Sequence, residues 1–328
     1  MNELLQYALE VVVIPAALGA VCGAVALVRP LRMRRMAVEA SVAMGIALAF
    51  LASFIADPGW RALARQVVAV DGDVGVFERW HRLALVAAIL VPFAAILSAL
   101  RARRETARGM MLVFESAALA AVLSGMFVEF PQAGTWVQVG QGALVFAAIV
   151  AWACTTLATL WIAWVVFGTL AVLCQLSGFA YLAAMSAAVS LAAFLMATVA
   201  AIGGRRAGTP PIFAGGALLI VPGTLCALIA RAGMAYDQAG IPAWTWIVAA
   251  LMPLASVFFN GRVLRTERKA ARTFWAWLGV ALVAGALLAW TAYAQGSKSA
   301  GSGGGGDDDL SDMYGRAAGV SAPPLPRA

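Results

Sequence analysis

Residues 139–202 read VGQGALVFAAIVAWACTTLATLWIAWVVFGTLAVLCQLSGFAYLAAMSAAVSLAAFLMATVAAI and contain no charged side chain. About 20 apolar residues cross the ~30 Å hydrocarbon core of a bilayer as a helix, because each residue rises ~1.5 Å. The stretch therefore has room for three short membrane-spanning helices. Trp161 and Trp164 predict one membrane interface within it and Tyr181 predicts another, since amphipathic aromatic rings favour the headgroup zone.

The composition of the whole chain agrees with this stretch. Hydrophobic residues make up 63% of the 328 residues and charged residues 12%, with a mean hydropathy of +0.88. Soluble domains are about 45–50% apolar and about 25% charged, and much of their surface faces water. The composition excludes a soluble enzyme, a disordered chain and a disulfide scaffold. It predicts an integral membrane protein.

Outward from this stretch, further apolar segments are predicted to span the membrane: Leu4–Val28, Met36–Ile55, Leu83–Leu100, Met110–Val128, Ile212–Ala230, Ala243–Phe259 and Thr273–Tyr293. The first segment lacks a positive n-region and precedes an arginine cluster, so we expect a retained helix rather than a cleaved signal. The predicted fold class is an all-α, polytopic transmembrane helix bundle of about ten spans. If residues 139–202 cross only once, the number falls to eight.

Basic residues determine the predicted orientation. Most of the 23 lie in the clusters 29–35, 101–108, 205–206 and 262–272. These clusters share one side of the membrane only if residues 139–202 cross an odd number of times, and the positive-inside rule makes that side cytoplasmic. We therefore expect a bacterial cytoplasmic (inner) membrane protein with both termini extracytoplasmic. On this interpretation the net charge of +7 reflects topology, and no nucleic-acid partner is expected.

The predicted outer loop, residues 56–82, contains acids and arginines in equal number. Trp60, Leu63 and Val67 recur in it at helical spacing, which predicts a helix lying on the membrane surface. An ordinary connecting loop is the alternative.

The same loop supplies a candidate acidic site formed by Asp57, Asp71 and Asp73. Outward carboxylates can hold a metal ion and a lipid-linked phosphate. The sequence DGD at 71–73 also fits a simple turn, and the calcium-loop pattern fails there.

Three carboxylates fall within predicted spans: Glu10, Glu39 and Glu115. A charged group in hydrocarbon needs water, a partner or a proton. Glu39 and Glu115 lie near predicted cytoplasmic helix ends, where they can pair with nearby arginines. Glu10 has no basic neighbour in sequence and lies ~9 Å into the first span. It is the candidate buried group for proton or cation coupling.

Prolines and glycines interrupt several spans. A proline lies inside four spans, at Pro15, Pro92, Pro222 and Pro253, and each removes a backbone hydrogen-bond donor. In transporters such breaks form binding sites, whereas in structural proteins they affect only helix packing. A Gly-x-x-x-Gly motif at 19–23 predicts close helix contact.

Residues that carry metal or redox chemistry are scarce. There is one histidine, His81, and no C-x-x-C pair joins the cysteines Cys22, Cys154, Cys174 and Cys226. We expect no cofactor and no metal site, and we interpret the cysteines as small buried hydrophobes.

The composition changes at residue 294, which predicts two domains: a transmembrane helical domain, 1–293, and a flexible Gly/Ser-rich, acidic and Pro-rich tail, 294–328. The tail is interpreted as a disordered solvating segment, as a sequence of engineered origin, or as a docking peptide. In the last case, residues 307–328 bind a protein partner through Leu310, Met313 and Tyr314.

No motif assigns the chain to a family, and three function classes stay open. The first is a non-catalytic membrane subunit, anchor or scaffold that presents its tail to a partner. The second is a secondary transporter of a small molecule, lipid or ion that uses the intramembrane carboxylates. Helix count, prolines and a short similarity between residues 90–105 and 251–268 favour it. The third is an enzyme acting on a lipid-linked substrate at the outer carboxylates. The lipid bilayer is the expected partner in all three, and the sequence leaves the oligomeric state open.

Overall fold

The computed structural model describes residues 2–28, 35–57, 82–101, 118–121, 135–153, 159–207, 216–256 and 269–302. Every element in these ranges is a helix and none is a strand, which confirms the all-α class for the described residues. Four helical stretches are long and apolar enough to cross a membrane: Leu4–Ala24, Thr159–Leu176, Ala180–Ile202 and Phe274–Ser297. Several shorter apolar helices accompany them, as expected of an integral membrane protein.

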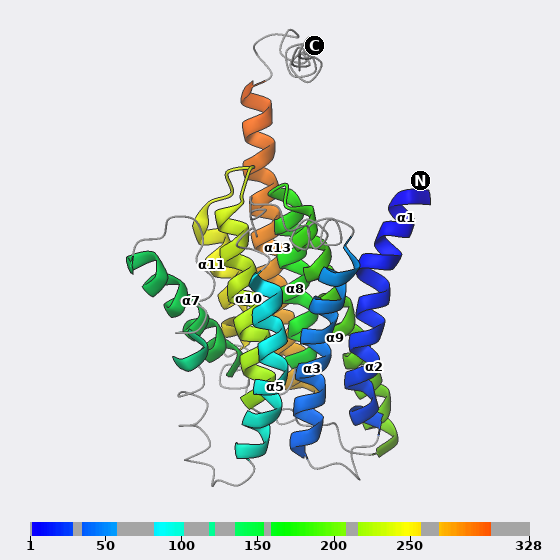
Figure 1. Cartoon of the computed structure of the whole chain (residues 1–328). Helices are drawn as coiled ribbons and strands as arrows, with labels where there is room; N and C mark the ends of the chain where they lie inside the picture. Colours follow the sequence, from blue (N-terminus) through cyan, green and yellow to red (C-terminus); the bar gives the residue numbers. More distant parts are fainter. Residues whose placement is uncertain are drawn as a thin grey trace, which may run out of the picture. The chain divides into compact units, whose positions relative to one another are not determined.

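The predicted apolar segments correspond to helices wherever they are described. The elements outside residues 139–202 are α1 Asn2–Ala8, the π-helical η1 Leu9–Val13, α2 Ile14–Val28, α3 Arg35–Ala56, α5 Arg82–Arg101, α10 Gly216–Ala235, α11 Ala243–Leu251, the 3₁₀ turn η3 Met252–Leu254 and α13 Lys269–Ser302 (Figure 1). Most of the segment expected at Met110–Val128 lies outside the described residues.

The long uncharged stretch folds as three helices: α7 Thr135–Ala153, α8 Thr159–Leu176 and α9 Ala180–Ala207. A tight turn joins α8 to α9. Gly178 has a φ of 84°, a left-handed conformation that glycine adopts without strain, and Phe179 donates its N–H to the Cys174 carbonyl at 2.9 Å. The chain therefore reverses at a glycine, without any charged residue to mark the turn.

A second loop lies against this turn. Gln238 donates its N–H to the Ser177 carbonyl at 3.1 Å, which ties the α10–α11 loop to the α8–α9 turn. Asp237 shapes that loop, because its carboxyl oxygens accept the N–H groups of Ala239 and Ile241. Its carboxylate is therefore occupied by the backbone.

Helices α2, α3 and α9 pack side by side (Figure 1). A Cβ atom added to Gly45 would lie 2.5 Å from the Gly19 carbonyl oxygen, and one added to Gly23 would collide with the Met196 sulfur. The helix backbones are thus in direct contact, which confirms the close packing predicted from the motif at 19–23.

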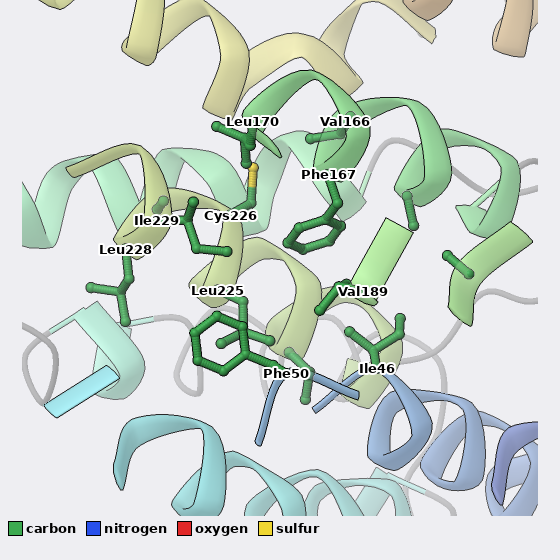
Figure 2. Packing of buried hydrophobic residues seen from close by; sticks show 14 of the residues in the cluster. Ile46, Phe50, Val166, Phe167, Leu170, Val189, Leu225, Cys226, Leu228 and Ile229 are labelled. Atoms are coloured by element: carbon green, nitrogen blue, oxygen red, sulfur yellow. The ribbon is translucent and has the colours of Figure 1, made fainter. Parts of the chain in front are cut away.

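The core around these helices is apolar (Figure 2). Fully buried side chains come from α3, α8, α9 and α10: Ile46, Phe50, Val166, Phe167, Leu170, Val189, Leu225, Cys226, Leu228 and Ile229. Several buried hydroxyls donate back to their own helix, as Thr169 does to the Val165 carbonyl at 2.8 Å. Cys174 and Cys226 are buried as predicted, Cys22 is half-buried, and Cys154 lies outside the described residues.

The chain divides into two compact units, Met1–Leu288 and Ala289–Ala328. In the second unit the first residues of the tail expected at 294–328 are helical, since α13 continues to Ser302. Ser297 donates to the Ala294 carbonyl at 2.9 Å within this extension. Once a helix has formed, each added residue costs little, so a change in composition does not by itself end it.

Candidate functional site

The first helix changes its winding where polar groups gather. Pro15 has no N–H to donate to the Val11 carbonyl one turn earlier, and the residues just before it, Leu9–Val13, wind as the π-helix η1. The hydroxyl of Ser53, on α3, donates to that carbonyl at 2.6 Å. A side chain on the neighbouring helix thus replaces the backbone donor that proline removes.

A carboxyl group and two phenols lie at the same end of α3. Asp57 follows the last residue of α3 and is only 1% exposed. The phenol of Tyr7, on α1, lies near enough to interact electrostatically with the Asp57 carboxyl and with the phenol of Tyr181, the second residue of α9. We call Tyr7, Ser53, Asp57 and Tyr181 the Asp57 cluster. A helix C-terminus carries partial negative charge, so a carboxylate there favours nearby donors or a cation. Chemically, the cluster is suited to holding a proton or a small cation.

Asp57 differs from its expected setting. It was predicted to open an outward acidic loop, but it is only 1% exposed and lies near Tyr7 of α1. The physical reason is that α3 extends through Ala56, so the residue after it stays inside the helix bundle. Asp71 and Asp73 lie outside the described residues, as does most of the predicted surface helix within 56–82. Among the residues that the structure describes, no group of three His, Cys, Asp or Glu side chains is placed to hold a metal ion.

Glu10 is exposed rather than buried among the helices of the bundle, and its role in proton or cation coupling stays a prediction. Val11, Pro15 and Gly19, spaced four apart, occupy the buried face of the first helix, and Glu10 is turned away from it. Its carboxyl oxygen Oε1 accepts the side-chain N–H of Gln6 at 3.0 Å. This carboxyl group therefore faces whatever surrounds the helix.

The remaining predicted site residues are not brought together by the described structure. Glu39 lies on α3, but its side chain is outside the description. Outside the described residues altogether are Glu115 and the tail residues Leu310, Met313 and Tyr314. Their predicted roles stay predictions.

Sequence reasoning missed Arg231, which lies on α10 and is half-buried. Its Nε is buried, and no hydrogen-bond acceptor reaches it within the described part of the chain. The buried hydroxyl of Thr224, seven residues earlier on the same helix face, likewise has no partner there. An unaccompanied arginine in the segment ALIARAGMA was the signal in the sequence. Such a guanidinium attracts an anionic group, for example a phosphate.

Trp161 and Trp164, which are predicted to mark a membrane interface, form part of an aromatic cluster. Trp164 stacks on Trp277 of α13, with ring centroids 6.4 Å apart and planes 6° from parallel. It also contacts Phe194 of α9, at 5.0 Å. Edge and stacking contacts of this kind join α8, α9 and α13. Tyr181, the other predicted marker, is 43% exposed.

No protein-family model matches the chain, and comparisons with curated proteins and with solved structures gave no match either.

Proposed function

We propose that the protein is a multi-pass component of the bacterial cytoplasmic membrane with a non-catalytic role: a subunit, anchor or scaffold that presents its C-terminal tail to a protein partner. The observation that carries this proposal is the close-packed, apolar core. Gly19 and Gly45 bring α2 and α3 into backbone contact, and the side chains around Phe50 are apolar and fully buried. Helices fixed in this way suit a rigid support better than a moving carrier.

A bundle of ten spans with both termini extracytoplasmic remains part of the proposal. The three helices α7, α8 and α9 support an odd number of crossings within residues 139–202. Helix ends predicted to be extracytoplasmic also lie together: Asp57 is beside Tyr7, and Gln238 bonds to Ser177. Reporter fusions after Arg206 and after Tyr293 test the orientation. The first is expected to report cytoplasm and the second the opposite side, and the reverse result would contradict this topology.

Docking by the tail is tested by identifying what co-purifies with the protein from its native membrane. We compare the full chain with a variant truncated after Ser302 and with a triple alanine variant at Leu310, Met313 and Tyr314. The matched control replaces the neighbouring residues Asp307, Asp308 and Asp309 by asparagine. A partner that the truncation and the triple variant both lose, and that the control keeps, is the expected result. Equal recovery with all four proteins would refute a docking role for the tail.

A second candidate, a proton- or cation-coupled transporter, is favoured by the Asp57 cluster. Transporters place ion sites where a spanning helix departs from regular α-helix, and the π-helical turn η1 follows directly after α1, whose Tyr7 lies near Asp57. On this hypothesis, proteoliposomes loaded with a pH-sensitive dye show a proton flux that Asp57→Asn abolishes and that Tyr181→Phe reduces. Flux equal to that of protein-free vesicles would rule the transporter out. The enzyme alternative gains no support, because Asp57 is only 1% exposed and its proposed partners Asp71 and Asp73 lie outside the described residues.

A further inference from the structure

One face of the first helix combines exposed apolar residues with a polar pair. Gln6, Glu10, Ile14, Leu18 and Val21 follow one another at intervals of three or four residues, and all five are exposed. A π-helical turn needs slightly more than four residues, so η1 keeps Glu10 and Ile14 in line. We call these five residues the Glu10 seam. The opposite face of the same helix packs on α3 and α9.

The polar pair of the seam has unused bonding capacity. The bond from Gln6 to Glu10, 3.0 Å long, uses one N–H of the carboxamide and one oxygen of the carboxyl. The second N–H and the second oxygen have no partner within the described residues. Tyr7 lies near Asp57 at the end of α3. Glu10 is three residues further on, so along the helix axis it lies ~4.5 Å farther from that end of α3. Lipid tails offer such groups no hydrogen bond, which makes this position costly unless another protein surface covers it.

We propose that the Glu10 seam binds the same seam of a second copy of the chain, so that two first helices form a dimer. Copies of one membrane protein insert with the same orientation, and a two-fold axis along the membrane normal places equal residues at equal depth. Each Gln6 is then offset by one helical turn from the partner's Glu10, and its free carboxamide N–H can reach that carboxyl as the other N–H reaches Glu10 of its own helix.

The apolar part of the seam fits the same occupant. C-terminal to the polar pair, the large exposed residues Ile14, Leu18 and Val21 flank the small exposed residue Ala17. The large side chains can act as knobs that pack into the space left by Ala17 of a facing helix. A single polar level within an apolar seam fixes the register of two helices. A second copy supplies the complementary donors by symmetry, whereas an unrelated helix would need its own donors at the same depth. The inference deepens the proposed structural role and rests on it only for the placement of this helix in the bilayer.

Disulfide trapping in native membranes tests the seam. In a chain whose four native cysteines are replaced by alanine, we introduce Ile14→Cys or Val21→Cys on the seam, and Val13→Cys as the control. Val13 is exposed and adjacent to Ile14 but lies about 100° away around the helix. Oxidation is expected to give a band of twice the chain mass from both seam variants, at least about fivefold stronger than from the control. Equal trapping at all three positions, no trapping, or a cross-link to a protein of another mass would overturn the proposal.

The polar pair is tested by measuring dimerisation of the full chain in liposomes by single-molecule photobleaching over a range of dilutions. Glu10→Leu is expected to weaken dimerisation about tenfold, because a pair of interhelical hydrogen bonds is lost. Glu10→Gln keeps a hydrogen-bonding group and is expected to retain most of the affinity. Exposed residues tolerate such changes, and thermal stability identical to the parent confirms folding. Unchanged dimerisation of the folded Glu10→Leu variant would contradict the role of the pair.

The dimer experiments and the tail experiments can give independent results. Disulfide trapping depends only on residues of the first helix, whereas partner docking is tested with changes beyond Ser302. A dimer without a tail partner would leave the seam intact and remove the proposed docking role, and a tail partner without a dimer would do the reverse.

Discussion

The first helix and the α8–α9 hairpin are both long apolar segments, yet they use their surfaces differently. Of the most apolar 18-residue window in Leu4–Ala24, 28% is buried inside the protein, against 56% in each of Thr159–Leu176 and Ala180–Ile202. The first helix is interrupted by Pro15 and carries a polar pair outward. The hairpin is continuous, turns at one glycine and buries its side chains on both helices.

The difference shows that hydropathy alone does not predict whether one face of an apolar helix packs against other helices or stays exposed. Leu18 is 53% exposed and Leu170 is fully buried, although both lie in uninterrupted apolar sequence. Lipid is as apolar as a protein core. Which side chains are buried within the bundle is therefore decided by how closely the helix backbones pack and by hydrogen bonds between helices, not by hydrophobicity. Substitutions at the contacts that distinguish the two regions are expected to lower the stability of the protein by different amounts.

The largest effect is expected from Gly45→Leu, which separates the first helix from α3. A side chain at this position meets the Gly19 carbonyl oxygen already at its Cβ atom, so the two backbones must move apart. We expect a loss of about 3 kcal/mol or more, because overpacking against backbone cannot be relieved by changing a rotamer. Loss of monodisperse protein on size-exclusion chromatography in detergent, and a lowered unfolding midpoint, measure it.

Gly140→Leu is the matched control for Gly45→Leu, since a Cβ at residue 140 on α7 meets nothing within 4 Å. Its stability is expected to stay close to that of the parent. If both variants are equally stable, the backbone contact between α2 and α3 is not what holds the first helix.

The hairpin is expected to be weakened less, by Gly178→Ala. This residue has a φ of 84°, which costs an L-residue with a side chain about 1–2 kcal/mol. The added Cβ would also lie 3.2 Å from the Gln238 side-chain oxygen. A thermal unfolding curve in detergent gives the shift. Gly296→Ala in α13 is the control, because this residue is helical and an added Cβ atom would meet no other atom within 4 Å; the variant is expected to be neutral or stabilising. Equal stability of the Gly178→Ala variant would show that the turn tolerates another backbone conformation.

Much of this contrast follows from sequence, and some of it does not. The segment predicted at Met36–Ile55 forms α3, Arg35–Ala56, because an apolar run bounded by charged residues determines both ends. Residues 139–202 lack such bounds, so the turn at Ser177 and Gly178 is apparent only once the backbone is seen.

The sites were harder to predict than the spans. Glu10 is exposed whereas the next residue, Val11, is buried. The apolar pattern of the sequence does not resolve which of two adjacent residues faces the bundle. Asp57 was expected to face outward and is buried, and the half-buried Arg231 was not predicted as a site residue at all. Their surroundings depend on which distant helices pack beside them, and spacing along the chain carries no information on that.

The polar break in the first helix is expected to be weakened by Ser53→Ala. The Val11 carbonyl then loses the hydroxyl donor, and Pro15 offers no N–H in its place. A buried carbonyl without a partner costs about 1–3 kcal/mol. We expect a loss of about 1–2 kcal/mol in the free energy of unfolding, and the double variant Ser53→Ala, Pro15→Ala is expected to regain part of it. A single variant as stable as the parent would mean that the π-helical turn satisfies the carbonyl by itself.

The smallest effect is expected from Ser190→Ala in the hairpin, although the bond removed has nearly the same form. The Ser190 hydroxyl donates to the Trp164 carbonyl at 2.7 Å, against 2.6 Å for the bond from Ser53 to Val11. Trp164, however, lies within continuous α-helix, so the N–H of Gly168 still reaches its carbonyl after the change. Only a second, supplementary bond is lost, and the expected cost is about 0.5–1 kcal/mol. Measuring both serine variants under one detergent condition isolates the contribution of proline: a cost for Ser190→Ala equal to or above that for Ser53→Ala would show that helix breaking by Pro15 does not make its hydrogen bond special.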